Sequence, residues 1–234
     1  MTPPGMTIAC FLAFSGPHAR VSDADRARFA AIVGAAPKLR KALVFTPATD
    51  PYLDDAASPR LAAQLYFADI ADLEAALARN GPLQALAAPD AFPSLAGATV
   101  TQQAMLVRAF PVPDPRFRTA PGEPHCSFLV SYEGRAEDLN AWLDHYITQH
   151  PPIMARFPGI REIEVCTRID WCGFLPWPRA DAMLRNKVVF DSAAALAAAL
   201  GSPVIDDMRA DYGRFPPFTG PVSHTPMATL AILT

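Results

Sequence analysis

The feature that most constrains this sequence is a repeat that relates its second half to its first. Moving the chain along itself by 123 positions aligns a series of identical residues between Phe67 and Gly97 without a gap. The matched pairs are Phe67 with Phe190, Leu73 with Leu196, Leu77 with Leu200, Phe92 with Phe215, Pro93 with Pro216 and Gly97 with Gly220. A Phe-Pro-x-x-x-Gly segment thus recurs at a fixed distance from a Leu-x-x-x-Leu stripe. This spacing indicates a duplicated structural unit.

The order of predicted elements is the same in both halves. Period-2 and short apolar runs predict strands, and helical spacing predicts the helices between them. The first half is expected to contain strands at Thr7–Phe14, Leu39–Thr46, Leu61–Phe67 and Thr99–Phe110, with helices from Ser22 to Pro37 and from Asp69 through Leu77. The second half is expected to contain strands at Cys126–Tyr132, Ile160–Ile169, Asn186–Phe190 and Thr225–Leu233, with helices at Ala136–His150 and Ser192–Leu200 and a further helical stretch after them. Each half therefore reads βαββαβ.

A proline-rich segment separates the two halves. Five prolines lie between Pro111 and Pro124, and this composition ends helices and ladders and stiffens a linker. We therefore expect an N-terminal ferredoxin-like unit at 1–110, a linker at 111–124 and a C-terminal unit at 125–234. Each unit would leave one sheet face uncovered. The expected fold is α+β, with two tandem ferredoxin-like βαββαβ units packed sheet to sheet as an intrachain dimeric α+β barrel.

Charge and hydropathy exclude several classes of function. The 20 basic and 23 acidic residues include no basic run, so neither nucleic acid nor a membrane is an expected partner. The longest apolar runs, Ile8–Phe14 and Ala193–Leu200, are too short to span a bilayer. Residues before Ile8 lack Lys and Arg, so no secretory signal is expected and the expected location is the cytoplasm. Nucleotide-binding, zincin and hydrolase motifs are absent, and the four cysteines include no CxxC pair.

The densest polar and aromatic segment runs from Trp142 to Pro152. On a helix, Trp142, Tyr146 and His150 share one face. Pro151 and Pro152 lack backbone N–H groups, so the helix is expected to kink or end at His150. Free carbonyls at a helix end favour a protonated imidazole, which suits a residue that accepts and returns protons. A structural histidine that caps the backbone remains an equally valid interpretation.

These residues resemble a known family. His150-Pro151-Pro152-Ile153 followed by Phe157-Pro158-Gly159-Ile160-Arg161, after a helix with Trp and Tyr, is similar to the signature of EthD-like domains. The similarity covers roughly Ser127 to Thr234 and extends to Asp211, Arg214 and Phe215. It implies a mostly apolar ligand pocket between sheet and helices, with one or two groups that transfer protons. A shift of 121 positions places Phe29 opposite His150, so the first half would be a degenerate copy without the histidine.

The candidate site residues follow from the helix and from the resemblance. His150 is the expected catalytic acid or base and Tyr146 its hydrogen-bond partner; Asp144 is a weaker alternative, because it lies on another helix face. The expected substrate-binding residues are Trp142, Arg168, Trp171, Phe215 and His224. The aromatic segment after Arg168 is expected to be a lid or a dimer contact. No metal or cofactor is expected.

The leading hypothesis is an EthD-like protein that binds a small apolar, aromatic or lactone-like organic compound. Proton transfer by His150 would make it an isomerase, a cyclase or a cofactor-free oxygenase, and a homodimer is a further expectation. Two alternatives stay open. The first is a haem protein, because some haem proteins also combine tandem ferredoxin-like units with one axial histidine. The second is a non-catalytic module that binds a metabolite or another protein.

Overall fold

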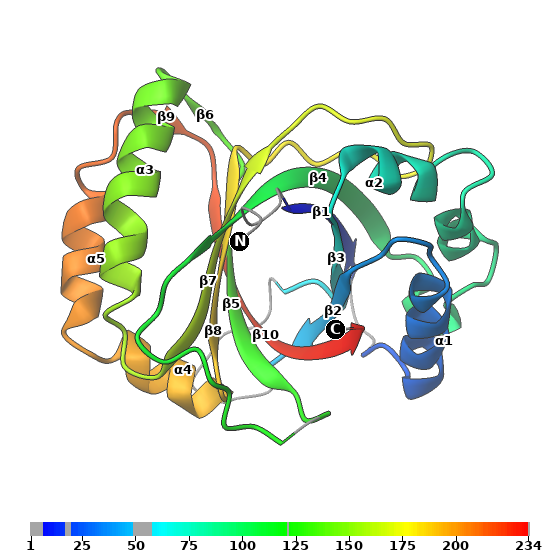
Figure 1. Cartoon of the computed structure of the whole chain (residues 1–234), viewed down its shortest axis with the longest axis horizontal. Coiled ribbons are helices and arrows are strands. Elements are labelled where there is room, and N and C mark those ends of the chain that lie inside the picture. The colour runs from blue at the N-terminus through cyan, green and yellow to red at the C-terminus, as the bar shows by residue number, and fades with distance from the viewer. Residues whose placement is uncertain (1–6, 17–19, 49–57, 121, 234) are drawn as a thin grey trace, which may run out of the picture.

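The computed structural model describes residues 7–16, 20–48, 58–120 and 122–233. In this structure eight strands form one closed barrel in the order β1-β3-β2-β10-β5-β8-β7-β4 (Figure 1). The first half supplies β1 Thr7–Ser15, β2 Lys41–Pro47, β3 Leu61–Phe67 and β4 Thr99–Phe110. The second half supplies β5 His125–Tyr132, β7 Ile160–Arg168, β8 Leu184–Phe190 and β10 Val222–Leu233. Each half thus contributes four adjacent strands, which confirms the expected fold class.

Two edge pairings close the barrel. Strand β2 pairs antiparallel with β10, where Phe45 lies opposite Thr229. Strand β4 pairs antiparallel with β7, where Met105 lies opposite Arg168. The two sheets therefore do more than face each other, because each satisfies the free backbone groups at both edges of the other.

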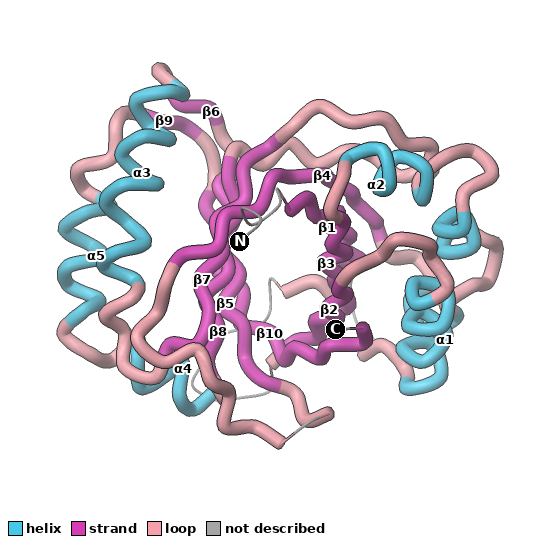
Figure 2. Tube along the Cα trace, viewed as in Figure 1, coloured by secondary structure: helices cyan, strands magenta, loops and turns pink. Residues whose placement is uncertain are grey.

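Helices cover the outside of the barrel. Figure 2 shows α1 and α2 on one side and α3, α4 and α5 on the other. Their bounds are α1 Asp23–Gly34, α2 Ile70–Ala76, α3 Leu139–Met154, α4 Ala193–Leu200 and α5 Val204–Tyr212, with short 3₁₀ turns at Pro82–Ala87 (η1) and Pro93–Leu95 (η2). A small ladder pairs β6 Arg135–Ala136 with β9 Phe218–Thr219. In the part of the chain that the structure describes, no helix has the length and apolar character needed to cross a membrane.

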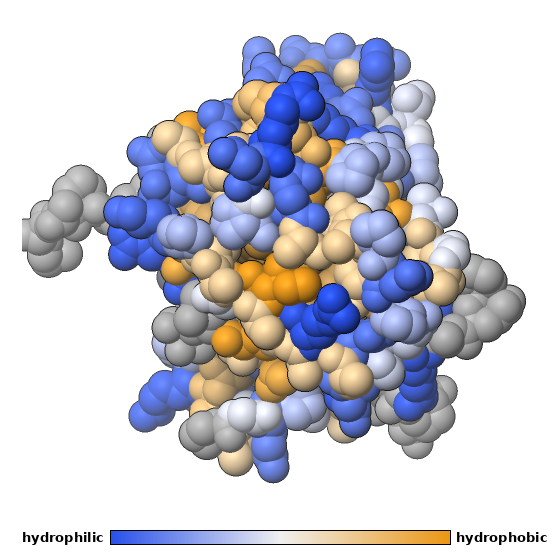
Figure 3. Space-filling model, turned by 90° about the vertical axis from the view of Figure 1, so that its right-hand side faces the viewer, coloured by the Kyte–Doolittle hydropathy of each residue, from blue (hydrophilic) through white to orange (hydrophobic). Residues whose placement is uncertain are grey.

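Side-chain caps begin three of these helices where the sequence predicts. Ser22 accepts a hydrogen bond from the Asp25 amide, Asp69 from the Ala71 amide and Ser192 from the Ala195 amide. On the first-half side, Figure 3 shows apolar side chains gathered near the middle of the face with hydrophilic residues around them.

Helix α3 does not end at His150, which is one of the two outcomes that the sequence predicted there. It continues through Pro151 and Pro152 to Met154, and both prolines lie inside the helix. The fixed φ of proline suits a helix, but each proline lacks an N–H group and its ring crowds the carbonyl four residues earlier. Burial of Met154 and of Phe157 just beyond offers the compensating packing. His150 therefore lies within the helix, not at its end.

The connection between β7 and β8 packs against the other half of the chain. Leu175 is 5% exposed and belongs to the first-half core, and the Trp177 ring lies 5.4 Å from the Phe14 ring. The Gln102 amide donates hydrogen bonds to the carbonyls of Leu175, at 3.1 Å, and Trp177, at 2.7 Å. Residues 169–183, which connect β7 to β8, therefore join the two halves within one chain, and we call this segment the clamp. Its expected role as a dimer contact stays a prediction.

We predict that this clamp contributes to global stability. Leu175→Asp places an unpaired carboxylate in the first-half core and is expected to lower the free energy of unfolding by about 3 kcal/mol. The matched control is Phe174→Asp, because Phe174 is 40% exposed and packs under Arg79. Its expected cost is at most about 1 kcal/mol. Urea denaturation measures both, and equal losses would contradict the clamp.

Candidate functional site

A cavity of about 600 Å³ lies between the outer face of the second-half sheet and helices α3, α4 and α5. Its walls are mostly apolar and include Phe128, Val130, Met154, Phe157, Val188, Phe190, Leu196, Leu200, Ile205, Met208 and Val222. The polar and aromatic-polar side chains that line it are Tyr132, His150, Asn186, Arg209, Tyr212 and His224. A mostly apolar cavity with a few polar groups is typical of a small-molecule site.

A buried carboxylate on α5 orients His150 of α3. The Nδ1 atom of His150 lies 2.7 Å from Oδ2 of Asp211, and the Asp211 side chain is 1% exposed. The other carboxylate oxygen lies 3.1 Å from Nε2 of His145, one turn earlier on α3. Because a carboxylate accepts hydrogen bonds, it favours the tautomer in which Nδ1 of His150 carries the proton. The Nε2 atom is then a base, and it forms no hydrogen bond with any residue that the structure describes.

The environment of His150 favours the neutral imidazole. Burial lowers the pKa of His150 below its ordinary value of 6.5, although the hydrogen bond and charge of Asp211 act in the opposite direction. The sequence predicted a protonated imidazole at a helix end. That prediction is wrong, because α3 continues past His150 and the ring is 5% exposed.

Tyr146 does not hydrogen bond to His150. The rings of Tyr146 and His150 lie 4.8 Å apart, and the Tyr146 hydroxyl accepts a hydrogen bond from Nδ2 of Asn186. The Trp142 ring stacks on Tyr146 at 5.2 Å. Trp142 and Tyr146 are both fully buried behind the cavity wall, so they support His150 and are not placed to touch a ligand.

Phe215 and His224 lie at the same site in different roles. The Phe215 ring lies 5.1 Å from the His150 ring in an edge-on contact, outside the cavity lining. His224 on β10 lines the cavity, packs 5.6 Å from Phe128, and has its pKa lowered by burial. His224 is therefore the predicted binding residue that the structure brings to the same cavity as His150.

Arg168 and Trp171 lie away from this cavity. Arg168 pairs with Asp181 at 2.9 Å, and Trp171 packs under the Arg179 guanidinium at 4.1 Å. Both line a separate surface hollow. Arg168 and Trp171 lie there because the clamp leads the chain away from the end of β7 and toward the first half.

Asp211 is a candidate site residue that the sequence analysis did not assign a role. It appeared only within the span of the resemblance, because its partner lies 61 positions away on another helix. The repeat contains a usable signal: the shift of 123 positions places Ala88 opposite Asp211. The first half therefore lacks the histidine and also the acid.

The structure places the repeated positions in equivalent contacts. Phe29 packs on Phe92 at 5.8 Å in the first half, where His150 packs on Phe215 at 5.1 Å in the second. The Phe14 ring lies 6.2 Å from Phe29, and the clamp adds Trp177 to the same aromatic cluster. In this layer the first half holds only aromatic side chains from this set. The second half holds the hydrogen-bonded pair of His150 and Asp211, which we call the dyad.

Comparison with solved structures identifies the fold. An anthrone oxidase-like protein superimposes with a TM-score of 0.64 at 13% identity, over 98% of this chain and 94% of that one. A protein provisionally named a monooxygenase from Lactobacillus acidophilus gives 0.51 at 13% identity, over 96% and 94%. A chlorite dismutase from Candidatus Nitrospira defluvii gives 0.51 at 11% identity, over 95% and 91%.

No protein-family model and no curated protein sequence matches the chain. The structural similarity extends over nearly the whole length of the chain and of its neighbours, so it includes both halves and the way they join. At these identities the similarity establishes architecture. The chain has the dimeric α+β barrel fold, with both halves of the barrel in one polypeptide.

Proposed function

We propose that this protein binds a small apolar organic compound, such as an aryl ketone or a lactone, and moves a proton on one of its carbon atoms. The observation that carries the proposal is the pairing of His150 with Asp211 at the wall of an apolar cavity. The pairing leaves Nε2 as the basic atom. A neutral, oriented imidazole at a water-poor site is suited to general base catalysis near pH 7.

The reaction needs a place for the proton and a place for the negative charge. Nε2 of His150 takes the proton from a carbon next to the carbonyl, and the buried Asp211 carboxylate stabilises the imidazolium that forms. The electron pair of the broken C–H bond moves to the carbonyl oxygen as an enolate. The imidazolium then returns the proton to another carbon, or to the same one, so the base is regenerated.

Tyr132 is the group placed to stabilise the enolate oxygen. Its side chain lines the cavity, and burial raises its pKa, so the hydroxyl keeps its proton at neutral pH. The Tyr132 ring lies 5.4 Å from the Tyr146 ring in an edge-on contact, and Asn186 donates a hydrogen bond to the Tyr146 hydroxyl. This buried packing holds the Tyr132 ring in place, and a fixed neutral donor costs little reorganisation during the reaction.

A haem-binding role is the second candidate, and the same dyad supports it. A histidine that ligates iron usually donates its other ring N–H to a carboxylate, as His150 does to Asp211. The cavity volume of about 600 Å³ is in the range of ligand sites. His150 would hold the haem through Nε2, and the haem iron would supply redox chemistry. Arg209 is the only Lys or Arg among the described lining residues, and it pairs with Asp206, so the haem propionates would find little charge complement.

We predict that the wild-type protein accelerates exchange of the α-hydrogens of 2-tetralone with solvent deuterium, and that His150→Gln reduces the rate to the buffer background. The reason is that glutamine keeps a polar side chain but has no basic atom. Proton NMR of the ketone in D₂O measures the rate. Titration with haemin while a Soret band is recorded tests the second candidate on the same sample.

The matched control for this experiment is Asp144→Asn. Asp144 is an exposed residue on the same helix, so its loss of charge is expected to leave the exchange rate unchanged. An equal exchange rate in the wild type and in His150→Gln would exclude His150 as the base. A Soret band at stoichiometric haem would favour the second candidate.

The pH dependence provides a separate prediction. Burial places the pKa of His150 below 6.5, so the imidazole is neutral at pH 7 and the exchange rate falls only as the pH drops below 6.5. Asp211→Asn removes the influence that raises this pKa and is expected to move the acidic limb of the profile to still lower pH. A limb that moves to higher pH would contradict the assigned role of Asp211. Histidine NMR titration supplies the same pKa values independently.

A further inference from the structure

A second cavity, of about 460 Å³, lies inside the barrel. Strand residues alternate between the outer layer and the barrel interior, so Asn186 faces the helices while its neighbours Arg185 and Lys187 face inward. The cavity is lined at one end of the barrel by Ser15 of β1, Thr101 of β4 and Ser223 of β10. Its apolar walls include Phe11, Phe45, Ala62 and Leu129.

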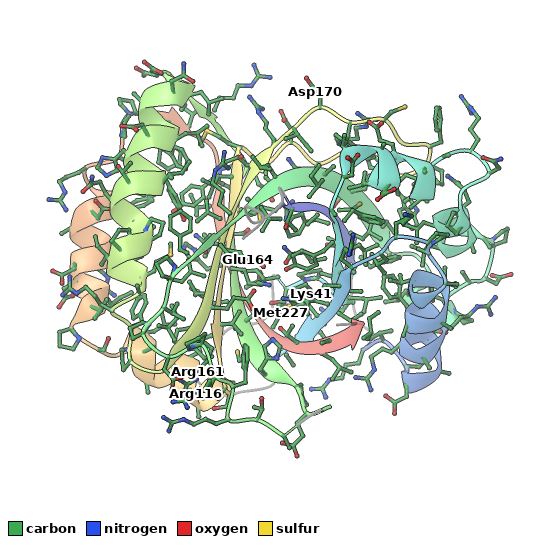
Figure 4. All side chains as sticks on the ribbon, viewed as in Figure 1. Lys41, Arg116, Arg161, Glu164, Asp170 and Met227 are labelled. Atoms are coloured by element: carbon green, nitrogen blue, oxygen red, sulfur yellow. The ribbon has the colours of Figure 1, made fainter. Side chains whose placement is uncertain are left out.

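One inward-facing cation is fully paired. Nζ of Lys187 lies 2.9 Å from Glu162, 3.0 Å from Glu164 and 2.8 Å from the Tyr66 hydroxyl. Figure 4 shows Glu164 directed into the barrel, with Lys41 on the strand across from it. The three donors of the ammonium group are used within this cluster. Lys187 therefore offers no free charge to a ligand.

Arg185, two residues earlier on β8, has no such partner. Its Nε donates to Oε1 of Gln103 at 3.3 Å, and its guanidinium lies 5.5 Å from the Phe11 ring. It forms no ion pair with any residue in the described ranges, and its two terminal nitrogens make no hydrogen bond there. Glu133 and Asp181 lie at the rim of the cavity, but both are exposed, and Asp181 pairs with Arg168.

Arg185 is half-buried and forms no ion pair with a described residue; burial lowers its pKa, although the charge of Glu133 acts in the opposite direction. The arrangement around it nevertheless holds it in place. Gln103, whose amide also bonds the backbone of Ala182 at the end of the clamp, fixes the Nε side. Arg185 lines the cavity, and its two Nη atoms can donate hydrogen bonds to both oxygens of one carboxylate.

We propose that the barrel interior is a binding site for a small aromatic monocarboxylate, separate from the cavity of His150. The carboxylate would pair with Arg185, and the ring would lie against Phe11, Phe45 and Leu129. The apolar walls exclude a polyanion such as a nucleotide, because most of its charges would stay unpaired. The site uses the inner face of the sheet, whereas His150 belongs to the helix layer outside it.

The first test is calorimetric titration with phenylacetate and with phenylacetamide, its neutral amide. Phenylacetate is expected to bind with one site per chain, and phenylacetamide at least about tenfold more weakly, since only the anion pairs with Arg185. Arg185→Gln is expected to weaken phenylacetate binding by at least about tenfold without loss of fold, because Arg185 forms no ion pair with a described residue that the substitution would break. Equal affinities for the acid and the amide would overturn the proposal.

Two controls separate this site from its surroundings and from the proposed catalytic site. Arg168→Gln makes the same change in charge at an exposed ion pair outside the lining of the barrel cavity, so it is expected to leave phenylacetate binding unchanged. His150→Gln is also expected to leave it unchanged, whatever its effect on deuterium exchange. Weaker binding in either variant to the extent seen in Arg185→Gln would contradict the interior site.

Methionine methyl NMR locates the ligand in the wild-type protein without any variant. Met227 packs with Phe45 inside the barrel, and it is labelled in Figure 4, whereas Met154 and Met208 line the cavity of His150. Saturating phenylacetate is expected to shift the Met227 methyl signal and to leave those of Met154 and Met208 in place. The reverse pattern would overturn the interior site even if Arg185→Gln failed to fold.

Discussion

Edge pairing between the two halves is the constraint on which the rest of this structure depends. A four-stranded antiparallel sheet with two helices on one face has two open edges and one uncovered face. Pairing of β2 with β10 and of β4 with β7 removes all four edges and covers both faces at once. The closed barrel therefore requires both halves, whereas a ligand site could lie in one half alone.

The two halves differ within this constraint. Phe29 and Ala88 in the first half stand at the repeated positions of His150 and Asp211 in the second. Phe29 packs with Phe14 and Phe92 as ordinary core, and the clamp from the second half completes that core with Trp177. The second half keeps a polar dyad in the equivalent layer, beside a cavity of about 600 Å³. The first half forms the equivalent layer without such a polar pair.

The sequence predicted local structure well because local structure depends on local patterns. Leu61–Phe67 and Thr99–Phe110 form strands with the predicted bounds, and Ser22, Asp69 and Ser192 cap helices as expected. The predicted end of α3 at His150 was wrong, because proline propensity describes an isolated helix. In this protein the burial of Met154 stabilises the last turn of the helix.

The site was predicted less completely because its contacts join distant segments. His150 and His224 were found from the helix and the strand that carry them, and both line the cavity. The sequence signal for Asp211 is that its repeat position, like that of His150, holds an apolar residue in the first half. Arg168 and Trp171 were misplaced because nothing local shows that their loop crosses to the other half. Arg185 gave no local signal, since its environment is created by barrel closure.

In the proposed function, the His150–Asp211 dyad serves chemistry and not the fold. The most direct test is the free energy of unfolding of His150→Phe/Asp211→Ala, which gives the second half the side chains of the first. Replacing both members of a buried polar pair leaves no unpaired charge between them, so we predict stability within about 1 kcal/mol of the wild type, or higher. A loss of about 3 kcal/mol or more would show that the fold itself requires the pair, and would contradict the account.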